Sequence, residues 1–314
     1  MKILLTGAFG NLGTVCLEQA LKLGYSVRCL DRPTSSNRKV AQRYASKVEI
    51  HWGDICDEKL LQKSVNGVDA ILHNASLLPP YTEKNPTQAE AINVGGSRKL
   101  IRIAEQQEPK PVFVFPSSVT VFGLSEEGTV RTSLDPVEAT DNYTHHKLSV
   151  ESLLQQSILP WVILRVGVSV DARTLSTDRS TFRTLLSIKP NNPLEYIHPH
   201  DTALAMCRAA NTTAAHKKIL LIGGGTSCQV THREFLSTAF QCLGLNLPKH
   251  VHGKETYYTH WMDTQESQSL LRYQQHSFQD YHNEMRQKLK LYRYFCWPFR
   301  WFIEPLLRVV LPKI

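Results

Sequence analysis

The residues best suited to chemistry lie near the middle of the chain. Tyr143 and Lys147 stand four positions apart in the segment YTHHK, and Ser118 lies upstream in the segment SSVTVFG. Residues four apart share one face of a helix, so the Lys147 ammonium would lie beside the Tyr143 phenol. A positive charge there favours the phenolate and brings a phenol with an ordinary pKa of about 10 into use as a proton carrier. We therefore predict proton transfer at a substrate oxygen that the Ser118 hydroxyl helps to hold.

A glycine-rich turn follows the first predicted strand. Gly7, Gly10 and Gly13 form a Gly-x-x-Gly-x-x-Gly pattern between an apolar run and an apolar helical pattern. Glycines allow a tight turn and let backbone N–H groups approach a pyrophosphate at the positive end of the helix. Glycine triplets are common in turns, but this position between strand and helix predicts a dinucleotide-binding turn. Its expected contacts are Gly7, Phe9, Gly10, Asn11, Leu12 and Gly13.

The ends of the next predicted strands bear on the choice of cofactor. Asp31 ends the second strand, where a carboxylate can accept hydrogen bonds from the ribose hydroxyls of an adenosine, which favours NAD. Its neighbour Arg32 could pair with a 2′-phosphate, which keeps NADP open, or could be an ordinary surface charge. Further cofactor contacts are expected where the third and fourth strands end, at Asp54, Ile55, Asn74 and Ala75.

Short apolar runs alternate with helical patterns, as expected for a parallel sheet covered by helices. The first predicted strands are 2–6, 26–31, 48–52, 70–75, 112–117 and 162–166, with helices that include 12–23 and 88–106. The pattern loosens into loop and cap over 171–193, and then predicts a helix at 200–211, a strand at 219–222 and a helix at 232–243. We predict an α/β fold, in which a doubly wound, Rossmann-like parallel sheet of six strands carries a small C-terminal substrate-binding cap.

On this pattern the chain divides into three predicted parts. Residues 1–170 form a dinucleotide-binding domain, residues 171–288 a substrate-binding cap interleaved with late elements of the sheet, and residues 289–314 an aromatic and basic tail. The chain of 314 residues is 42% hydrophobic and 20% charged, which is an ordinary globular composition. Its seven scattered cysteines form no CxxC pair, so we expect neither a disulfide framework nor a metal site.

These motifs together resemble the extended short-chain dehydrogenase/reductase superfamily, specifically its NAD-dependent epimerase/dehydratase branch. Besides the glycine turn and the Tyr/Lys pair, the segments NVGG at 93–96, LRV at 164–166, YIHPHDTA at 196–203 and LLRYQ at 270–274 resemble motifs of that family. The resemblance implies that Ser118, Tyr143 and Lys147 form a catalytic trio and that Asn93 completes a tetrad. It also implies that Tyr143 and Lys147 contact the dinucleotide.

The sequence departs from the family pattern at two places that bear on the reaction. Val119 and Thr120 follow Ser118 where sugar-nucleotide dehydratases of the family carry an acidic pair, which disfavours dehydration. Leu194 and Glu195 stand where its nucleotide-sugar epimerases usually carry an Arg-Asp pair, and the cap segment before them is short. We therefore expect an enzyme that transfers hydride between a nicotinamide and a small or apolar secondary alcohol or ketone.

Two other functions compete with this expectation. Epimerisation of a nucleotide sugar through transient oxidation would use the same residues, but the reduced cofactor would stay bound through the reaction. A non-catalytic dinucleotide-binding scaffold subunit belongs to a different class of protein. The intact set of Ser118, Tyr143 and Lys147 argues against a scaffold, which has no need of all three.

The C-terminal tail has an unusual composition. It mixes Trp, Phe and Tyr with Arg293, Arg300 and Arg308, as is typical of a membrane interface, but it is too short and too often interrupted to span a bilayer. The net charge of +8 comes without a nucleic-acid-binding motif, so no nucleic-acid partner is expected. Because the first apolar run is too short for a signal peptide, we expect a cytoplasmic enzyme that the tail holds on the cytosolic face of a membrane. Packing of the tail on its own domain, or on a second copy in a homodimer, is the alternative.

Overall fold

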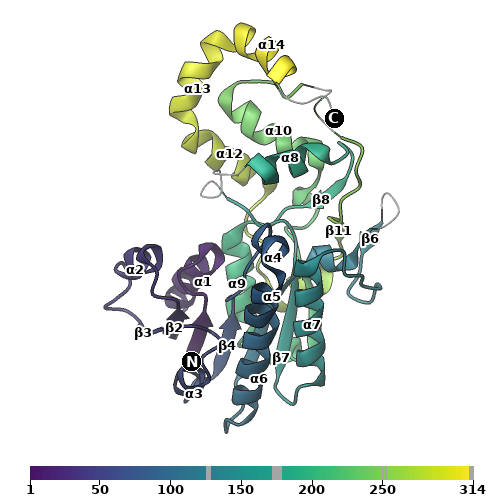
Figure 1. Cartoon of the computed structure of the whole chain (residues 1–314). Helices are drawn as coiled ribbons and strands as arrows, with labels where there is room; N and C mark the ends of the chain where they lie inside the picture. Colours follow the sequence, from purple (N-terminus) through teal and green to yellow (C-terminus); the bar gives the residue numbers. More distant parts are fainter. Residues whose placement is uncertain (125–128, 172–178, 249–250, 252, 311–314) are drawn as a thin grey trace.

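A computed structural model of the chain describes residues 1–124, 129–171, 179–248, 251 and 253–310 (Figure 1). Its centre is a parallel sheet in the order β3-β2-β1-β4-β5-β7-β9. The strands are β1 (Lys2–Thr6), β2 (Ser26–Asp31), β3 (Glu49–Trp52), β4 (Ala70–His73), β5 (Val112–Ser118), β7 (Trp161–Val166) and β9 (Lys218–Ile222). The order reverses between β1 and β4, and ligands of such sheets bind beyond the carboxyl ends of the strands at that point.

This topology confirms the predicted doubly wound α/β fold. The predicted count of six parallel strands was too low, because the described residues place seven in the sheet. The late strand predicted at 219–222 is β9, which pairs in parallel with β7 at the edge of the sheet. Sequence periodicity identifies a strand but not the strand it pairs with. Only the observed pairing with β7 therefore shows that β9 is the seventh strand of this sheet.

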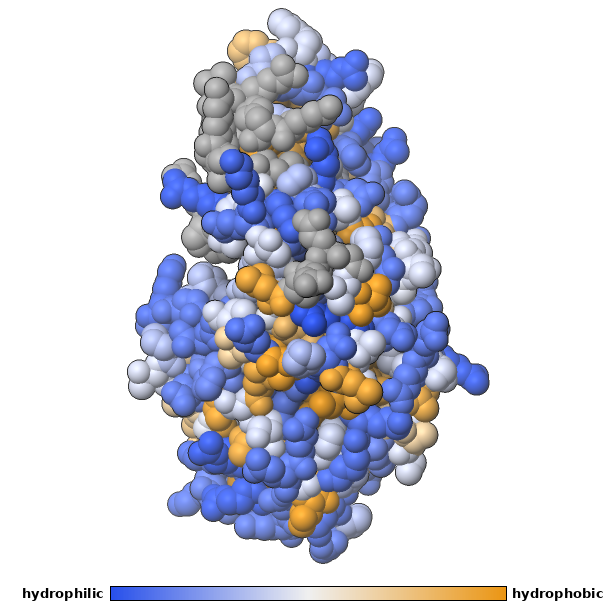
Figure 2. Space-filling view, turned by 90° about the vertical axis from the view of Figure 1, so that its right-hand side faces the viewer, coloured by the Kyte–Doolittle hydropathy of each residue, from blue (hydrophilic) through white to orange (hydrophobic). Residues whose placement is uncertain are grey.

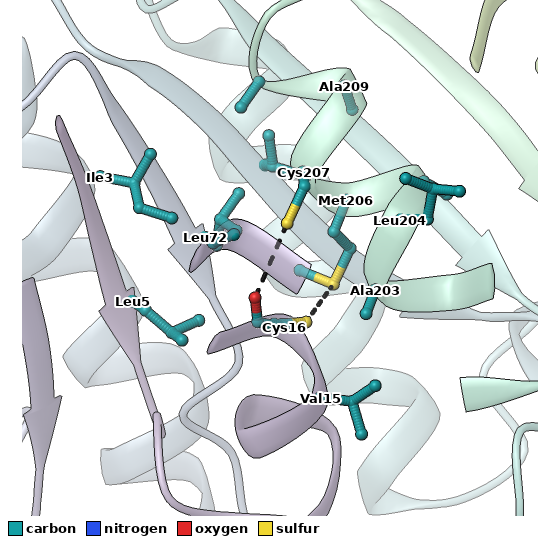
Figure 3. Close-up of a cluster of buried hydrophobic side chains, with 14 of the residues drawn as sticks. Ile3, Leu5, Val15, Cys16, Leu72, Ala203, Leu204, Met206, Cys207 and Ala209 are labelled. Atoms are coloured by element: carbon teal, nitrogen blue, oxygen red, sulfur yellow. Dashed lines mark hydrogen bonds between the residues drawn. The ribbon is translucent and has the colours of Figure 1, made fainter. Parts of the chain in front are cut away.

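Alternate side chains of each strand pack on two helical layers. Ile3 and Leu5 of β1 contact the layer that contains α1 (Asn11–Lys22) and α9 (Pro199–Ala209). Leu4 belongs to the opposite core, with α3 (Glu58–Val65), α6 (Ser97–Glu105) and α7 (Asn142–Gln156). Figure 3 shows the first core, where the Cys207 thiol of α9 lies 3.7 Å from the Cys16 carbonyl oxygen of α1. Both faces of the sheet are thus buried, which holds its strand ends in fixed positions.

The long helix predicted at 88–106 is helical but not uniform. It starts as α5 (Pro86–Glu90) after the short α4 (Tyr81–Lys84), widens into a π-helical turn, η1 (Ala91–Gly96), and continues as α6. Gly96 lies so close to Ile55 that a Cβ atom on it would come within 2.9 Å of the Ile55 Cγ2 atom. π-helical turns often occur at functional sites, and this one carries Asn93.

Two small sheets and several helices, most of them after β7, cover the carboxyl end of the central sheet (Figure 1). β8 (Pro193–Glu195) pairs antiparallel with β10 (Gln229–Thr231), and the short β6 (Val130–Arg131) pairs in parallel with β11 (Trp261–Met262). The helices of this part are α8 (Arg179–Ser187), α10 (His232–Leu243) and α12 (Phe278–Lys288), whereas α11 (Gln265–Leu271) packs against α9 and β9. Short 3-10 turns lie at η2 (Val119–Phe122), η4 (Thr213–Ala215) and η5 (Thr226–Cys228).

The prediction of a loop over 171–193 was incomplete. Residues 172–178 lie outside the described residues, but α8 and the start of β8 fall within the remainder. Phe182, Leu185 and Leu186 of α8 recur at helical spacing and pack with Leu236 and Leu247. This hydrophobic partner makes a helix stable in a segment whose polar composition favoured a loop.

The tail consists of helices at the far end of the cap from the sheet (Figure 1). They are α13 (Lys290–Cys296), the 3-10 turn η7 (Trp297–Phe299) and α14 (Arg300–Val310). Across the part of the chain that the structure describes, no helix is both long enough and apolar enough to cross a bilayer. The division of the chain into a dinucleotide-binding domain, a cap and a tail, with boundaries at residues 170 and 288, stays a prediction.

Candidate active site

The glycine turn between β1 and α1 is sterically constrained. Gly7 has a φ of +63°, and a Cβ atom on it would lie 2.9 Å from the Ala75 backbone nitrogen. A Cβ atom on Gly13 would lie 1.9 Å from the Gly7 carbonyl oxygen, so only glycine fits. Gly10 is the N-cap of α1, and no side chain caps this helix. The first N–H groups of α1 therefore remain available to an anion.

A cavity of about 230 Å³ begins at this turn and extends toward the end of β2. Of the residues predicted to bind the dinucleotide, it is lined by Gly7, Gly10, Asp31, Arg32, Asp54, Ile55, Asn74 and Ala75. Strand ends far apart in sequence meet here because β1, β2, β3 and β4 are neighbours in the sheet. The structure thus brings this half of the predicted set together.

The carboxylate of Asp31 connects the end of β2 to the glycine turn. It accepts hydrogen bonds of 2.8 Å from the backbone nitrogens of Phe9 and Arg32, and one of 3.0 Å from the Asn37 side chain. Burial raises the pKa of Asp31, whereas the bonds from Phe9 and Arg32 lower it. The Phe9 ring lines neither main cavity, because it packs against Trp52 with ring centres 5.3 Å apart. Phe9 therefore contributes to the site through its backbone nitrogen, which donates the hydrogen bond to Asp31.

A second, wider cavity of about 510 Å³ lies on the other side of the glycine turn. It shares Gly7, Gly10, Asn74 and Ser76 with the first cavity, so the two meet at the turn. The predicted residues that line it are Asn11, Leu12, Gly13, Ser118, Tyr143 and Lys147, besides the shared ones. The proposed catalytic trio and the dinucleotide-binding turn thus face one space.

Asn74 lies where the two cavities meet. Its amide nitrogen and oxygen are both buried, and among the described residues the side chain interacts only with the Cys16 thiol. A thiol is a weak hydrogen-bond partner, so a bound ligand could supply the stronger bonds that this buried amide lacks. Together with the glycine turn that a Cβ atom would block, this amide fits a bound dinucleotide.

Local structure at the start of α7 places Tyr143 and Lys147. The Asp141 side chain accepts a hydrogen bond of 2.7 Å from the Thr144 backbone nitrogen and forms a capping box, which starts the helix at Asn142. The Lys147 Nζ atom lies 5.6 Å from the centre of the Tyr143 ring and donates a 2.6 Å hydrogen bond to the Pro116 carbonyl oxygen. The helix and the end of β5 thus hold the ammonium beside the phenol.

Burial dominates the ionisation of this pair. It raises the pKa of Tyr143 to about 12, against a hydrogen bond with Ser118 that lowers it. It lowers the pKa of Lys147 to about 8, against the nearby Glu151 carboxylate that raises it. The role of Lys147 in favouring the Tyr143 phenolate stays a prediction, which includes the positive charge of a bound nicotinamide beside the lysine.

A buried polar network lies behind the trio. Glu151 is 2% exposed and forms a salt bridge of 2.8 Å with Arg165 of β7. It also accepts a 2.5 Å hydrogen bond from the Ser117 hydroxyl. Ser118, the next residue, points instead toward the cavity, where its hydroxyl lies 2.8 Å from that of Thr120. Alternation along β5 thus separates a serine of the core from the serine of the site.

Asn93 is engaged with the backbone of the segment that follows β4. Its side-chain oxygen accepts a 2.7 Å hydrogen bond from the Leu77 nitrogen, and its side-chain nitrogen donates a 2.9 Å bond to the Leu77 carbonyl oxygen. It shares a small hollow with Tyr143 and Lys147. Its direct role in a catalytic tetrad stays a prediction, while its contacts show that it holds residues near the cavity in place.

Several lining residues were not among the predicted site residues. They include Asn37 and Gly53 in the first cavity, and Val166, Gly167, Ser169, Val170 and Pro199 in the second. Asn37 could have been noticed, since it follows the second strand just after the capping Thr34. Gly53 and Val166 lie at or just after the ends of β3 and β7, so the sheet itself places them at the cavities. Pro199 begins α9, and Gly167, Ser169 and Val170 follow β7, where no sequence signal indicated a site.

Comparisons with known proteins agree with this architecture. Residues 3–168 match the model of the NAD dependent epimerase/dehydratase family. A UDP-glucose 4-epimerase of Pasteurella multocida is 33% identical over 166 residues, which cover 49% of this chain and 48% of that protein. A decarboxylating sterol-4-alpha-carboxylate 3-dehydrogenase of Dictyostelium discoideum is 24% identical over 262 residues, which cover 79% of this chain and 78% of that one. The chain thus spans about half the length of the UDP-glucose 4-epimerases it matches.

The fold is also similar to that of solved structures. UDP-glucuronic acid 4-epimerase from Bacillus cereus, in complex with UDP-glucuronic acid and NAD, superposes with a TM-score of 0.75 at 21% identity. The superposition covers 93% of this chain and 99% of that one, which shows a shared fold. The family match includes the glycine turn, Ser118, Tyr143 and Lys147 and extends over more than half of the chain. The chain therefore belongs to the NAD dependent epimerase/dehydratase family, as the motifs predicted.

Proposed function

We propose that this chain is an NAD-dependent oxidoreductase that transfers hydride between the nicotinamide and a secondary alcohol or ketone. The observation that carries the proposal is the cavity that Ser118, Tyr143 and Lys147 share with the glycine turn. The family to which the chain belongs is NAD-dependent, which supports the choice of cofactor. Gly7, Gly10 and Gly13 would hold the pyrophosphate, and Asp31 the adenosine ribose.

The chain's own residues would move the proton and orient the substrate. When bound, NAD supplies the hydride acceptor for the hydrogen on the carbinol carbon. The Ser118 hydroxyl would bind the substrate oxygen, and the Tyr143 phenolate would take the proton from that oxygen as the carbonyl forms. Lys147, held by Pro116, would favour the phenolate through its charge. In the direction of reduction the phenol would return the proton to the alkoxide oxygen.

The lining of the wider cavity supports a neutral, largely apolar substrate. Among its described lining residues, Lys147 is the one cation and Asp171 the one carboxylate, and Leu78, Val166 and Val170 contribute apolar surface. Glu195, which stands where an anchoring pair was expected in epimerases, is 1% exposed and accepts a 2.7 Å hydrogen bond from the Met262 nitrogen. A substrate with a diphosphate would therefore find no cation besides Lys147 among these residues.

The Tyr143→Phe substitution tests the proposal. With a panel of apolar secondary alcohols, the variant should lose reduced-NAD formation by more than about a hundredfold, because it removes the proton carrier but keeps the ring. Its affinity for NAD, measured by calorimetry, should stay close to that of the parent protein. Tyr292→Phe, on the exposed tail, is the matched control and should be fully active. Activity of Tyr143→Phe within tenfold of the parent would remove Tyr143 from the mechanism.

Epimerisation is the second candidate, supported by the names of relatives such as the Pasteurella multocida UDP-glucose 4-epimerase. The two reactions differ in the fate of the reduced cofactor. A dehydrogenase releases reduced NAD in proportion to product, whereas an epimerase regenerates NAD in each turnover. Conversion of UDP-glucose to its epimer without net reduced NAD would therefore favour the second candidate.

We also propose that the tail docks the protein on the cytosolic face of a membrane. The large hydrophobic side chains exposed on it are Leu291, Tyr292, Tyr294, Phe295, Trp297, Phe299, Trp301, Phe302 and Leu306. On the face drawn in Figure 2, hydrophobic residues occur as separate groups, most of them near the middle and a few near the top and the lower edge. An exposed concentration of aromatic groups supports an interfacial partner. Residues 311–314 and the side chain of Arg308 lie outside the described residues.

Co-sedimentation with vesicles tests this docking. Trp301→Ser/Phe302→Ser should reduce vesicle binding, because both rings are exposed and would enter the interface. Leu124→Ser/Leu134→Ser removes two exposed hydrophobic side chains elsewhere and should leave binding unchanged. If the parent protein stays in the supernatant and instead forms a dimer that the tail variant disrupts, the tail is a subunit contact.

A further inference from the structure

A basic hollow lies where the cap meets the tail. It has a volume of about 490 Å³ and is lined by Asn283, Arg286, Gln287, Lys290 and Arg293. These residues recur at intervals of three and four through α12 and α13, so they follow one side of consecutive helices. The hollow therefore presents three cationic side chains and two amides along a single stripe.

The positive charges of this hollow have no carboxylate partner among the residues that the structure describes. None of Arg286, Lys290 and Arg293 forms a salt bridge with another described residue. The carboxylates on neighbouring turns have other partners: Glu284 lies 3.2 Å from the His198 ring nitrogen, and Glu304 accepts hydrogen bonds from Asn246. The uncompensated charge matches an anionic group.

Arg293 gives the hollow a fixed wall. One guanidinium nitrogen donates a 3.0 Å hydrogen bond to the Gln241 carbonyl oxygen, near the C-terminal end of α10. Gly244, which ends that helix with a φ of +79°, leaves space for the Trp297 ring and the Arg293 guanidinium. The remaining N–H groups of Arg293 stay available, and a planar guanidinium suits a phosphate oxygen pair.

The neighbours of this hollow identify the kind of partner. On α13, Leu291, Tyr294 and Phe295 are 75%, 78% and 69% exposed, close in sequence to the two basic residues of that helix. Just beyond, the Arg300 guanidinium lies 5.9 Å from the Trp297 ring centre. A free anion would satisfy the charges but leave this apolar surface in water. A bilayer surface with anionic headgroups satisfies both.

We propose that this hollow binds the phosphate of an anionic phospholipid headgroup, while the aromatic side chains of α13 and α14 enter the interfacial layer. The inference rests on the proposed membrane docking and adds to it a defined headgroup site. Arg286 and Lys290 supply charge from one helical stripe, and Arg293 supplies directional hydrogen bonds. The site also sets which side of the cap faces the bilayer, because α12 and α13 carry the stripe.

The test compares two double substitutions that remove equal charge. Arg286→Gln/Lys290→Gln alters the hollow, and Lys59→Gln/Lys63→Gln alters an equivalent exposed pair on α3. The full chain is sedimented with vesicles of phosphatidylcholine and with vesicles that also contain phosphatidylserine. We expect the parent to prefer the anionic vesicles, and the first variant to lose affinity for them by about tenfold to thirtyfold. The α3 variant should stay within about twofold of the parent.

The possible results separate the site from the docking. An equal loss in both variants would show that only net charge matters, and would overturn the site. Equal binding of the parent to both kinds of vesicle would also overturn the headgroup site, but it would leave the proposed membrane docking intact. If millimolar inorganic phosphate releases the parent protein from anionic vesicles completely, the hollow is a site for a free anion. That result would overturn the bilayer as its partner. Absence of all vesicle binding by the parent would overturn the docking itself. Equal thermal unfolding of the variants and the parent confirms that they fold.

Discussion

The Lys147 ammonium donates its 2.6 Å hydrogen bond to the carbonyl oxygen of Pro116, on the strand that ends with Ser118. This bond joins α7 to the end of β5 and orients the one described cation that lines the wider cavity. Because the lysine is buried, its charge depends on pH near the physiological range. The same buried position thus fixes where the Lys147 ammonium lies and lowers the pH at which it loses its charge.

Affinity for NAD should fall as pH rises through about 8. Burial lowers the pKa of Lys147 to about 8 from 10.5, so the ammonium is present below this pH and lost above it. Loss of a cation beside the bound dinucleotide should weaken binding by up to about tenfold per pH unit until the charge is gone. Calorimetric titration between pH 6 and 10 measures this. Lys147→Arg keeps its charge and should remove the dependence; an unchanged profile in that variant would contradict the assignment.

Gly13→Ala should disrupt the turn, whereas Gly10→Ala should not. The Cβ atom of the first would lie 1.9 Å from the Gly7 carbonyl oxygen, and that of the second 3.4 Å from the same atom. We expect Gly13→Ala to lower the free energy of unfolding by about 1–3 kcal/mol and to abolish NAD binding. Gly10→Ala should unfold like the parent but bind NAD more weakly, since it lines both cavities. Thermal unfolding with and without NAD compares them; equal stability of both variants would refute the steric argument.

Asn93→Ala should weaken cofactor binding together with stability. The substitution leaves the Leu77 nitrogen and carbonyl oxygen without their side-chain partner, at a cost of about 1–3 kcal/mol in the free energy of unfolding. Because this segment borders the cavities, the dissociation constant for NAD should rise as well. Chemical denaturation and NAD titration provide the two readouts. If turnover alone falls while both readouts stay constant, Asn93 acts directly on the substrate.

NAD should bind more tightly than NADP. The Asp31 carboxylate lines the first cavity and would repel a 2′-phosphate, whereas Arg32 beside it would attract one. Asp31→Asn removes the repulsion and should reduce the preference for NAD over NADP. Arg32→Ala removes the attraction and should increase that preference. Parallel titrations of both dinucleotides with the three proteins measure these changes. Tighter binding of NADP by the parent would show that Arg32 outweighs Asp31.

Much of the fold and of the candidate site could be predicted from local sequence patterns. The strands and the glycine turn follow from apolar periodicity and from backbone geometry, which act over a few residues. The same holds for Tyr143 and Lys147, since four-residue spacing on a helix places them on one face whatever surrounds them. Asp31 and Asn74 were found because strand ends in a parallel sheet meet at one edge.

Other features depend on partners far away in the sequence. α8 forms in a segment predicted as a loop because Leu236 and Leu247 supply the surface on which it packs. β9 adds a seventh strand because its edge pairs with β7. Asn93 contacts Leu77 through a π-helical turn that interrupts a helix predicted as regular. The local sequence around either partner does not predict any of these contacts.

Sequence by itself determined which chemical groups this protein carries and the order in which they occur along the chain. Only the tertiary structure decided their environment. Burial raises the pKa of Tyr143 and lowers that of Lys147, because packing removes water from both groups. The exposure of Tyr294 and Trp301 was likewise decided by where the tail helices lie on the cap. Desolvation and exposure are sums over all surrounding atoms, and those atoms come from the whole chain.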